Sequence, residues 1–168
     1  MPPDDPIPAA NAAPGAVRPD GLWLDDLAAG MTFRSDSYAV TEAEIVEFAS
    51  RYDPQLFHID PERARDSFFG GLAASGWLTA AITIRLFDQA VPVATGVIGS
   101  EISLKWTTPT RPGDLLHLEA RIDEITASRS RTGRASVLFS YDTINQDGEV
   151  RQHTSGRVLV WRRPTSFP

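Results

Sequence analysis

The segment Gly70–Ala90 is the longest apolar stretch of the chain and carries a helical pattern. Leu72, Ala80, Ile84 and Phe87 fall near one face of a helix. Other apolar and small residues leave little of the remaining circumference polar. A helix that is apolar almost all round is buried in a protein core. The pattern therefore predicts a buried helix over residues 70–90, whose small residues let other backbone come close.

A strand and a second helix are predicted ahead of this segment. Met31–Val40 alternates partly and contains aromatic and β-branched residues, which favours a strand. Thr41 is followed three positions later by Glu44, a capping-box arrangement that starts a helix. That helix should end at Asp53, because Pro54 disfavours an α conformation in the residue before it.

Four strand-like runs follow the apolar segment, separated by breaks that each contain a glycine. They are Thr95–Trp106, Leu115–Ile125, Ala135–Ile144 and Val150–Trp161. Asp147–Gly148, in the last break, is a strong signal for a β-hairpin turn. We expect hairpins to link these strands into one antiparallel sheet.

The order of the elements predicts an α+β protein with helices on one side of an antiparallel sheet. Because one helix is so apolar, we expect the sheet to curl around it. Between the two long helices, Asp60 resembles an N-cap, with Pro61 and Glu62 in the first turn. We therefore expect an overhanging loop with a short helix at most before the central helix.

The length of 168 residues suits one domain with a proper core. Residues 1–20 are dominated by Pro, Ala and Asp, and they cannot bury enough apolar surface to offset the entropy of ordering. We expect a flexible arm over residues 1–20 and a single domain over residues 21–168.

Composition argues against several classes of protein. The net charge of −6 speaks against a general nucleic-acid binder, which normally has a basic face. No apolar run approaches the ~18 residues needed to span a membrane, and no signal peptide is evident. The absence of cysteine excludes disulfides, a thiol nucleophile and thiolate-bound zinc. A cytoplasmic location fits this composition.

The stretch YDPQLFHID, residues 52–60, is the main candidate for chemistry. It places Asp53 and His58 five positions apart around a proline, on a loop that precedes the buried helix. Taken alone, Asp53 could cap a turn and His58 could be a hydrogen-bonded structural histidine. A metal site built from Asp53, His58 and Asp60 is disfavoured, because no second histidine joins them at a typical zinc spacing. We expect no metal.

Three segments together resemble a known family. They are Asp53–His58, with sequence DPQLFH, Phe69–Gly76, with sequence FGGLAASG, and Lys105–Leu116, with sequence KWTTPTRPGDLL. The chain resembles the MaoC-like dehydratases and R-specific enoyl-CoA hydratases, which have the hot-dog fold. It departs from the best-studied hydratases in having Tyr52 before the aspartate and Gln55 in place of an asparagine. The resemblance spans roughly residues 21–163.

The resemblance implies hydration or dehydration of an enoyl or 3-hydroxyacyl thioester, with a role in fatty acid metabolism. It assigns Asp53 and His58 to one shared water. An enolate-like thioester oxygen would be stabilised by a backbone N–H of Gly70 or Gly71, expected at the N-terminus of the buried helix.

Other residues receive lesser roles. Ser75 aligns with a serine that supports the acid or lines the pocket in relatives, although packing against the sheet is equally open. Gln55 could orient the water or the aspartate, and Phe57 could form a pocket wall because it neighbours His58. Trp77 and Trp106 are expected in the core rather than in an acyl pocket.

Four arginines are candidates for the phosphates of a CoA substrate, since arginine pairs well with phosphate oxygens. They are Arg129, Arg131, Arg134 and Arg162. The alternative is that they belong to a solvated loop and a charged tail. The substrate would be an acyl-CoA or an acyl-carrier thioester, and no redox or other cofactor is required. The resemblance also implies a homodimer or a higher homo-oligomer.

Two other functions stay open. A hot-dog acyl-CoA thioesterase would use a carboxylate to activate water against the thioester carbonyl. A non-catalytic acyl-binding or structural subunit would be expected to lack the aspartate or the histidine, and both are present.

Overall fold

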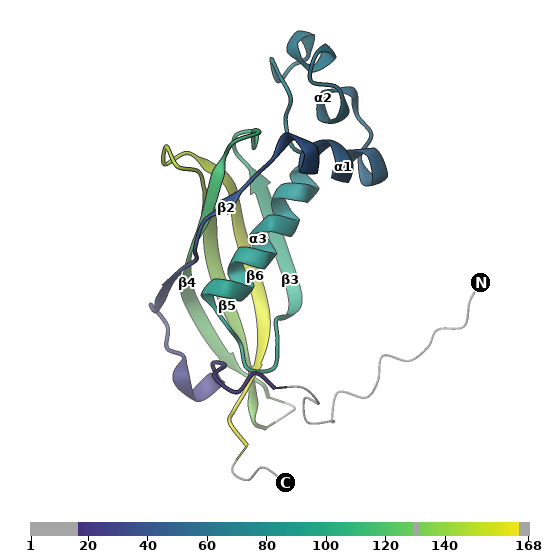
Figure 1. Cartoon of the computed structure of the whole chain (residues 1–168). Coiled ribbons are helices and arrows are strands. Elements are labelled where there is room, and N and C mark those ends of the chain that lie inside the picture. The colour runs from purple at the N-terminus through teal and green to yellow at the C-terminus, as the bar shows by residue number, and fades with distance from the viewer. Residues whose placement is uncertain (1–16, 130–131, 165–168) are drawn as a thin grey trace, which may run out of the picture.

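A computed structural model of the chain describes residues 17–129 and 132–164. Its elements, in chain order, are η1 (Leu24–Asp26), β1 (Thr32–Arg34), β2 (Tyr38–Ala39), α1 (Glu42–Tyr52), α2 (Leu56–Ile59), η2 (Arg63–Asp66), α3 (Gly76–Ala90), β3 (Ile98–Trp106), β4 (Leu115–Ala127), β5 (Arg134–Ile144) and β6 (Val150–Trp161). Figure 1 shows α3 lying along the hollow side of a curved sheet, with α1 and α2 beyond one end of it.

The strands form one antiparallel sheet in the order β1-β4-β5-β6-β3, with β2 also pairing with β4. The hairpins β4–β5 and β5–β6 are present as expected. The expected hairpin between β3 and β4 is wrong, because β3 pairs with β6 on the far side of the sheet. Residues 107–114 instead cross the end of the sheet, and Pro109 and Pro112 within them have no N–H for a strand ladder.

The strand expected at residues 31–40 is broken into β1 and β2, both paired with β4. Between them, Ser35 binds the backbone of Leu118 twice: its N–H donates to Leu118 O, and its Oγ accepts from Leu118 N. This side-chain contact replaces a regular ladder step, and it explains why one predicted strand is two short ones.

Helix α3 is the buried helix, but it begins at Gly76 rather than at Gly70. Ser75 is its N-cap, and the Ser75 hydroxyl accepts a hydrogen bond from the second residue of the helix. Ala73 and Ala74 donate their N–H groups to carbonyls outside the helix. Residues 70–75 are therefore an irregular segment whose apolar composition made it look like the first turns of α3.

The core lies between α3 and the concave face of the sheet. Phe87 of α3 packs edge-on against Phe139 of β5, with ring centroids 5.1 Å apart. The largest fully buried side chains of this core include Phe87, Phe139, Ile45, Leu86, Leu116, Leu118 and Ile122. This apolar layer positions α3 along its whole length.

Two pairs of buried threonines cross this layer. Thr79 Oγ1 donates to Thr110 Oγ1 at 2.9 Å, and Thr83 Oγ1 lies 2.7 Å from Thr143 Oγ1. All four side chains are buried. Because a buried hydroxyl without a partner is costly, these pairs favour one placement of α3 on the sheet.

The helices before α3 form an overhang at one end of the sheet, as Figure 1 shows. Thr41 caps α1 by accepting from Glu44 N, and Asp53 is its C-cap. Both ends of α1 are as predicted. The short helix expected near Asp60 is the 3₁₀ turn η2, and the helical turn α2, which carries His58, was not predicted.

Ordered contacts of the chain begin earlier than residue 21. Arg18 N donates to Ala94 O, and the Arg18 guanidinium pairs with Asp88 at the end of α3. The last residues of the predicted arm therefore touch the domain, whereas residues 1–16 lie outside the described part of the chain. Within the described residues, no helix is long and apolar enough to cross a membrane.

A buried ion pair fixes the segment that leads into β4. Arg151 Nε donates to Asp114 Oδ2 at 2.9 Å, and Arg151 Nη2 donates to Asp114 Oδ1 at 3.0 Å. Their side chains are 7% and 4% exposed. Asp114 Oδ2 also accepts from Arg111 N. The pair therefore ties β6 to the crossing segment 107–114.

Removing the arginine should be costly, because the carboxylate would stay buried without its cation. We expect Arg151→Met to lower the free energy of unfolding by about 3–5 kcal/mol. Arg34→Met, which breaks an exposed pair with Glu119, should cost less than about 1 kcal/mol. Urea unfolding of both variants at equal protein concentration measures the difference, and equal losses in the two variants would contradict this interpretation of the buried pair.

Candidate active site

Asp53 and His58, predicted as a pair from their spacing, face each other in the structure. Asp53 ends α1, and His58 lies in α2. His58 Nε2 lies 3.5 Å from Asp53 Oδ2, and the side chains are 6% and 20% exposed. The short loop with Pro54 turns the chain back on itself between them, so both groups point to the same place.

The backbone sets the state of the imidazole. His58 Nδ1 lies 2.7 Å from the carbonyl oxygen of Ala73. A carbonyl can only accept a hydrogen bond, so Nδ1 must carry the proton. In the neutral imidazole, Nε2 then has the lone pair. The nitrogen that faces Asp53 is therefore the one able to accept a proton.

Two side chains hold the Asp53 carboxylate. Ser75 Oγ donates to Oδ2 at 2.7 Å, and Gln55 Nε2 donates to Oδ1 at 2.7 Å. Burial alone would raise the pKa of Asp53, but these two hydrogen bonds, together with the charge of His58 whenever the imidazole is protonated, outweigh it and hold the pKa below its ordinary value. The structure thus brings Ser75 and Gln55 to the aspartate.

The Asp53–His58 pair presents two acceptors to one small volume, a carboxylate oxygen and the free imidazole nitrogen. Two acceptors cannot satisfy each other, but one water molecule can donate a hydrogen to each of them. A water held in this way would have two groups beside it that can take up a proton. The geometry suits general acid–base chemistry on a single water.

A pocket of about 640 Å³ opens in front of this pair. Its lining is Asp53, Gln55, Phe57, His58, Phe68, Phe69, Ala74, Gly76, Trp77, Thr79, Trp106, Thr107, Thr108, Pro109, Thr110 and Arg111. One side of it is polar and reactive, and aromatic rings form much of the rest. Such a mixture binds a ligand that has an apolar part and a few polar atoms. Phe57 lines it, as the sequence suggested.

Trp77 and Trp106 also line the pocket, so the expectation that they belong to the core is wrong. They are 61% and 44% exposed, and their rings meet edge to face with centroids 5.5 Å apart. Trp106 Nε1 donates to Gln152 Oε1 at 2.9 Å, which fixes the indole. The ring lies so close to Gly76 that a Cβ there would be 2.6 Å from it. A side chain at position 76 would therefore force the indole of Trp106 to shift.

The predicted backbone donors are placed differently from the expectation. Gly70 and Gly71 lie ahead of α3 rather than at its N-terminus, and neither lines the pocket. Gly70 N–H already donates to Ser67 O at 3.0 Å. Gly76, the first residue of α3, does line the pocket, and an N–H in the first turn of a helix has no partner within that helix.

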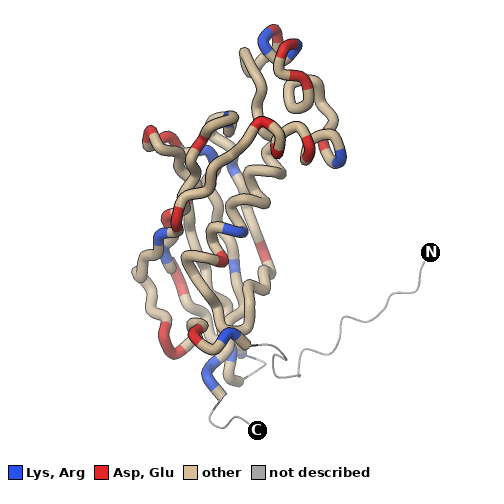
Figure 2. Tube along the Cα trace, viewed as in Figure 1, with Lys and Arg blue, Asp and Glu red and all other residues tan. Residues whose placement is uncertain are grey.

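The arginines predicted to bind phosphate lie elsewhere. Arg129 and Arg134 belong to the β4–β5 hairpin, and Arg162 follows β6. The hairpin and the end of β6 lie at the opposite end of the sheet from α1 and α2 (Figure 1), where Figure 2 shows several basic positions. Arg162 is paired with Asp25 at 2.6 Å. Arg131 is outside the described residues. None of the three described arginines lines the pocket, so that prediction is not supported within one chain.

Arg111 lines the pocket and was not among the predicted site residues. It lies in Lys105–Leu116, one of the three segments that carry the family resemblance, but no role was predicted for the arginine itself. No local pattern distinguishes an arginine that turns inward from one that faces water, and only the crossing of the sheet end by residues 107–114 brings it to the pocket.

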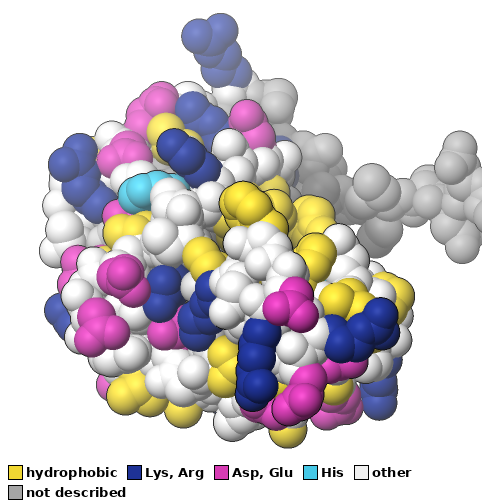
Figure 3. Space-filling view, turned by 90° about the horizontal axis from the view of Figure 1, so that it is seen from above, with side chains coloured by type: hydrophobic (Ala, Val, Ile, Leu, Met, Phe, Trp, Pro, Cys, Tyr) yellow, Lys and Arg dark blue, Asp and Glu magenta, His cyan; other side chains and the backbone are white. Residues whose placement is uncertain are grey.

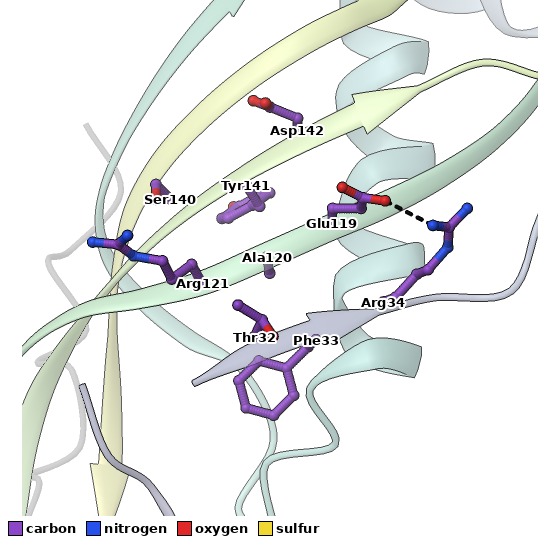
Figure 4. A pocket seen from close by; sticks show the side chains of 9 residues that line it. All are labelled: Thr32, Phe33, Arg34, Glu119, Ala120, Arg121, Ser140, Tyr141 and Asp142. Carbon is purple, nitrogen blue, oxygen red and sulfur yellow. Dashed lines mark hydrogen bonds and ion pairs between the residues drawn. The ribbon is translucent and has the colours of Figure 1, made fainter. Parts of the chain in front are cut away.

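A second hollow, of about 570 Å³, lies over β1, β4 and β5 and is shown in Figure 4. Its charged groups neutralise each other, as in the 2.8 Å pair between Arg34 and Glu119. Its lining includes the buried Tyr141, but burial raises the pKa of Tyr141 to about 12, so its hydroxyl stays protonated and is a poor base near neutral pH. Within residues 17–129 and 132–164, no cluster of three or more His, Cys, Asp or Glu side chains could hold a metal ion. The pocket at Asp53 and His58 is therefore the candidate active site.

The end of the molecule that carries the overhang is shown face-on in Figure 3, where hydrophobic side chains reach the surface among acidic and basic ones. Phe68, next to the pocket, is almost fully exposed. Apolar groups at the rim of a pocket are usual where a ligand or a second protein chain covers them.

The chain is similar to several known proteins. The sequence model described as MaoC like domain matches residues 26–141. The crystal structure of the MaoC-like dehydratase from Rhodospirillum rubrum is 53% identical with a TM-score of 0.83, covering 86% of this chain and 99% of that one. The similarity confirms the predicted hot-dog fold, in which the sheet curls around the central helix without closing into a barrel.

Two relatives are similar in sequence. The uncharacterized protein YdeM of Bacillus subtilis is 32% identical over 127 residues, which are 74% of this chain and 89% of the relative. The 3-hydroxybutyryl-CoA dehydratase of Methylorubrum extorquens is 25% identical over 130 residues, which are 77% of this chain and 82% of the relative.

Ser75 should control the titration of Asp53. Ser75→Ala removes the hydrogen bond to Oδ2 but leaves the carboxyl partly buried, so the pKa of Asp53 should rise. A carboxyl titration followed by carbon NMR measures the midpoint. In the wild type, the lowered pKa makes a contribution to stability that is full above the unfolded-state pKa and is lost as the pH falls through the folded-state pKa.

Thr41→Ala is the matched control, because it removes the N-cap hydroxyl of α1 without touching Asp53. Both variants lose a helix cap worth about 0.5–2 kcal/mol. Only Ser75→Ala should move the Asp53 midpoint to higher pH. An unchanged midpoint in that variant would show that the serine does not stabilise the carboxylate.

Proposed function

Because the chain belongs to the MaoC like domain family, we propose that it adds water to the double bond of an enoyl thioester and removes water from the 3-hydroxyacyl product. The observation that carries the proposal is the opposed pair of acceptors, His58 Nε2 and Asp53 Oδ2, 3.5 Å apart on the wall of a pocket. Both groups would act on the one water between them.

The reaction needs a proton taken from water and a proton given to the substrate. As the water oxygen bonds to Cβ of the enoyl group, one of its protons passes to the Asp53–His58 pair. A proton from the pair goes to Cα, and in the reverse direction each step is inverted. General acid–base catalysis of this kind contributes roughly 10²–10⁴-fold. Ser75 and Gln55 keep the carboxylate ionised and oriented for it.

The reaction also needs a donor for the thioester oxygen, which becomes enolate-like. Two backbone N–H groups are candidates. Gly76 N–H lies on the pocket wall at the N-terminus of α3, where the helix dipole favours negative charge. Gly71 N–H, unlike Gly70 N–H, makes no hydrogen bond to another described residue. A preorganised donor of this kind is worth about 3–4 kcal/mol in the transition state.

The substrate is an acyl group carried as a thioester on CoA or on an acyl carrier. The aromatic side chains of Phe57, Trp77 and Trp106 suit an acyl chain, and the relative in Methylorubrum extorquens is a 3-hydroxybutyryl-CoA dehydratase. No cofactor enters the chemistry, because the thioester itself acidifies the Cα proton. We place this activity in the cytoplasm.

We propose that the protein works as a homodimer or a larger homo-oligomer. Strand β3 is an edge of the sheet with unpaired backbone groups. Ile98 and Ile102 of β3, and Ile84 of α3 beside it, are exposed. A second copy would cover this edge, which natural sheets rarely leave open.

Replacing either reactive group should abolish most of the activity. We expect Asp53→Asn and His58→Ala each to lower the hydration rate by at least about 10²-fold while the protein stays folded. The loss of the enoyl thioester absorbance measures hydration of crotonyl-CoA and of longer enoyl-CoAs. Release of free thiol from the acyl-CoAs, measured in parallel, tests for a thioesterase.

Asp60→Asn and His153→Ala are matched controls. Asp60 accepts hydrogen bonds from Glu62 N and Arg63 N just before η2, and His153 pairs with Asp142 on the outer face of the sheet. Both controls should hydrate at close to the wild-type rate. Near-normal rates in Asp53→Asn and His58→Ala, or thiol release without hydration in the wild type, would refute the proposed reaction.

A further inference from the structure

The guanidinium of Arg111 is bonded to backbone carbonyls rather than to a carboxylate. Nη1 donates to Gly71 O and to Leu72 O, each at 2.9 Å, and Nη2 donates to Phe69 O at 2.5 Å. The guanidinium also lies on the pocket wall and is partly buried. All three of these guanidinium hydrogen bonds go to the backbone of residues 69–72. The side chain of Arg111 therefore holds this loop in place.

The loop needs such a partner. Three of its carbonyls, those of Phe69, Gly71 and Leu72, converge on one point, and their negative ends repel each other. Gly70 has φ +62° and Gly71 has φ +156°, a backbone path that L side chains rarely adopt. A planar cation with several fixed donors neutralises the converging oxygens, and hydrogen bonds from a charged donor are stronger than neutral ones.

The peptide groups of Ala73 connect this loop to α2. Ala73 N donates to Phe57 O at 3.1 Å, and Ala73 O accepts from His58 Nδ1 at 2.7 Å. The backbone on either side of Ala73 is bound to the crossing segment 107–114. Leu72 O is bound by Arg111, and Ala74 N donates to Thr110 O at 2.9 Å. The carbonyl that orients His58 is therefore fixed from both directions.

We propose that Arg111 is a positioning residue: by holding the carbonyls of residues 69–72, it fixes the Ala73 carbonyl that puts the His58 proton on Nδ1. The chain of contacts runs from Arg111 to Leu72 O, through the next peptide to Ala73 O, and from there to the imidazole. The kinetic consequence rests on the proposed hydration, whereas the position of the His58 proton does not.

A cation on the pocket wall could instead bind the substrate directly. The two roles predict different effects of replacing Arg111 with lysine. Lysine keeps the positive charge, but it is a point charge on a flexible stem and cannot offer a fixed fork to three carbonyls. A substrate-binding role would tolerate Arg111→Lys, whereas a positioning role would not.

The first test follows the imidazole itself. Nitrogen NMR of protein labelled at histidine reports which ring nitrogen carries the proton, and a His58→Gln variant assigns the His58 signals among the three histidines. With no substrate added, neutral wild-type His58 should show a single tautomer protonated at Nδ1. Arg111→Lys and Arg111→Met should show a mixture of tautomers.

The second test separates turnover from binding. We expect both variants to lower kcat by roughly 10²-fold, the effect of a misplaced catalytic group, with a smaller change in KM. Arg34→Met removes an exposed arginine on another face and should leave the His58 signals and kcat unchanged. A thermal melt establishes whether each variant is folded. If Arg111→Met does not fold, the result for Arg111→Lys alone tests the proposal.

The outcomes are distinct. Unchanged His58 signals in a folded Arg111→Lys variant would overturn the proposal, and so would a raised KM with kcat retained. Mixed tautomers would support it even if the wild type hydrated none of the enoyl thioesters, in which case only the proposed reaction would fail.

Discussion

A carbonyl oxygen can only accept a hydrogen bond, and this simple constraint governs the candidate site. The contact between Ala73 O and His58 Nδ1 leaves the lone pair of the neutral ring on Nε2, 3.5 Å from the Asp53 carboxylate. With the opposite tautomer, Nε2 would donate directly to Asp53, and the pair would satisfy itself without a water. The chemistry open to this pocket therefore depends on where one backbone carbonyl points.

The fold places that carbonyl by bringing three separate segments together. The overhang supplies Asp53 and His58, the segment before α3 supplies Ala73 and Ser75, and the crossing segment 107–114 supplies Arg111 and Thr110. None of the three is a long regular element. These segments are held in place because they adjoin the ends of α3 and of the strands. The buried ion pair of Asp114 and Arg151 also anchors the crossing segment 107–114.

Much of this was predictable from local patterns, and the rest was not, for identifiable reasons. The capping pattern at Thr41 and the Asp53–Pro54 pair predicted where α1 begins and ends. Both signals depend only on residues a few positions apart, so the sequence contains them in full. The start of α3 was predicted six residues too early, because its apolar approach is bonded to distant partners rather than to itself.

Long-range pairing was harder to foresee. The placement of β3 beside β6, and not beside β4, depends on the whole sheet. For the same reason the inward orientation of Arg111 had no signal in its own sequence. The spacing of Asp53 and His58, together with the resemblance to a family, was enough to predict the pair itself. Its partners Ser75 and Gln55 were named, but the bonds that they make were not.

The threonine pairs between α3 and its surroundings have a consequence for how this architecture can vary. Thr79 and Thr83 each meet one hydroxyl, on Thr110 and Thr143 respectively. The hydroxyls of Thr79 and Thr83 also donate to the carbonyls of Ser75 and Thr79, one turn earlier in the chain. A shift of the helix by one residue along its axis would therefore leave the buried hydroxyls of Thr110 and Thr143 without these partners, at roughly 1–3 kcal/mol for each. The pairs therefore fix the position of α3 along its own axis. Apolar residues around these pairs can then be replaced by others during evolution without moving the N-terminus of α3 relative to the pocket.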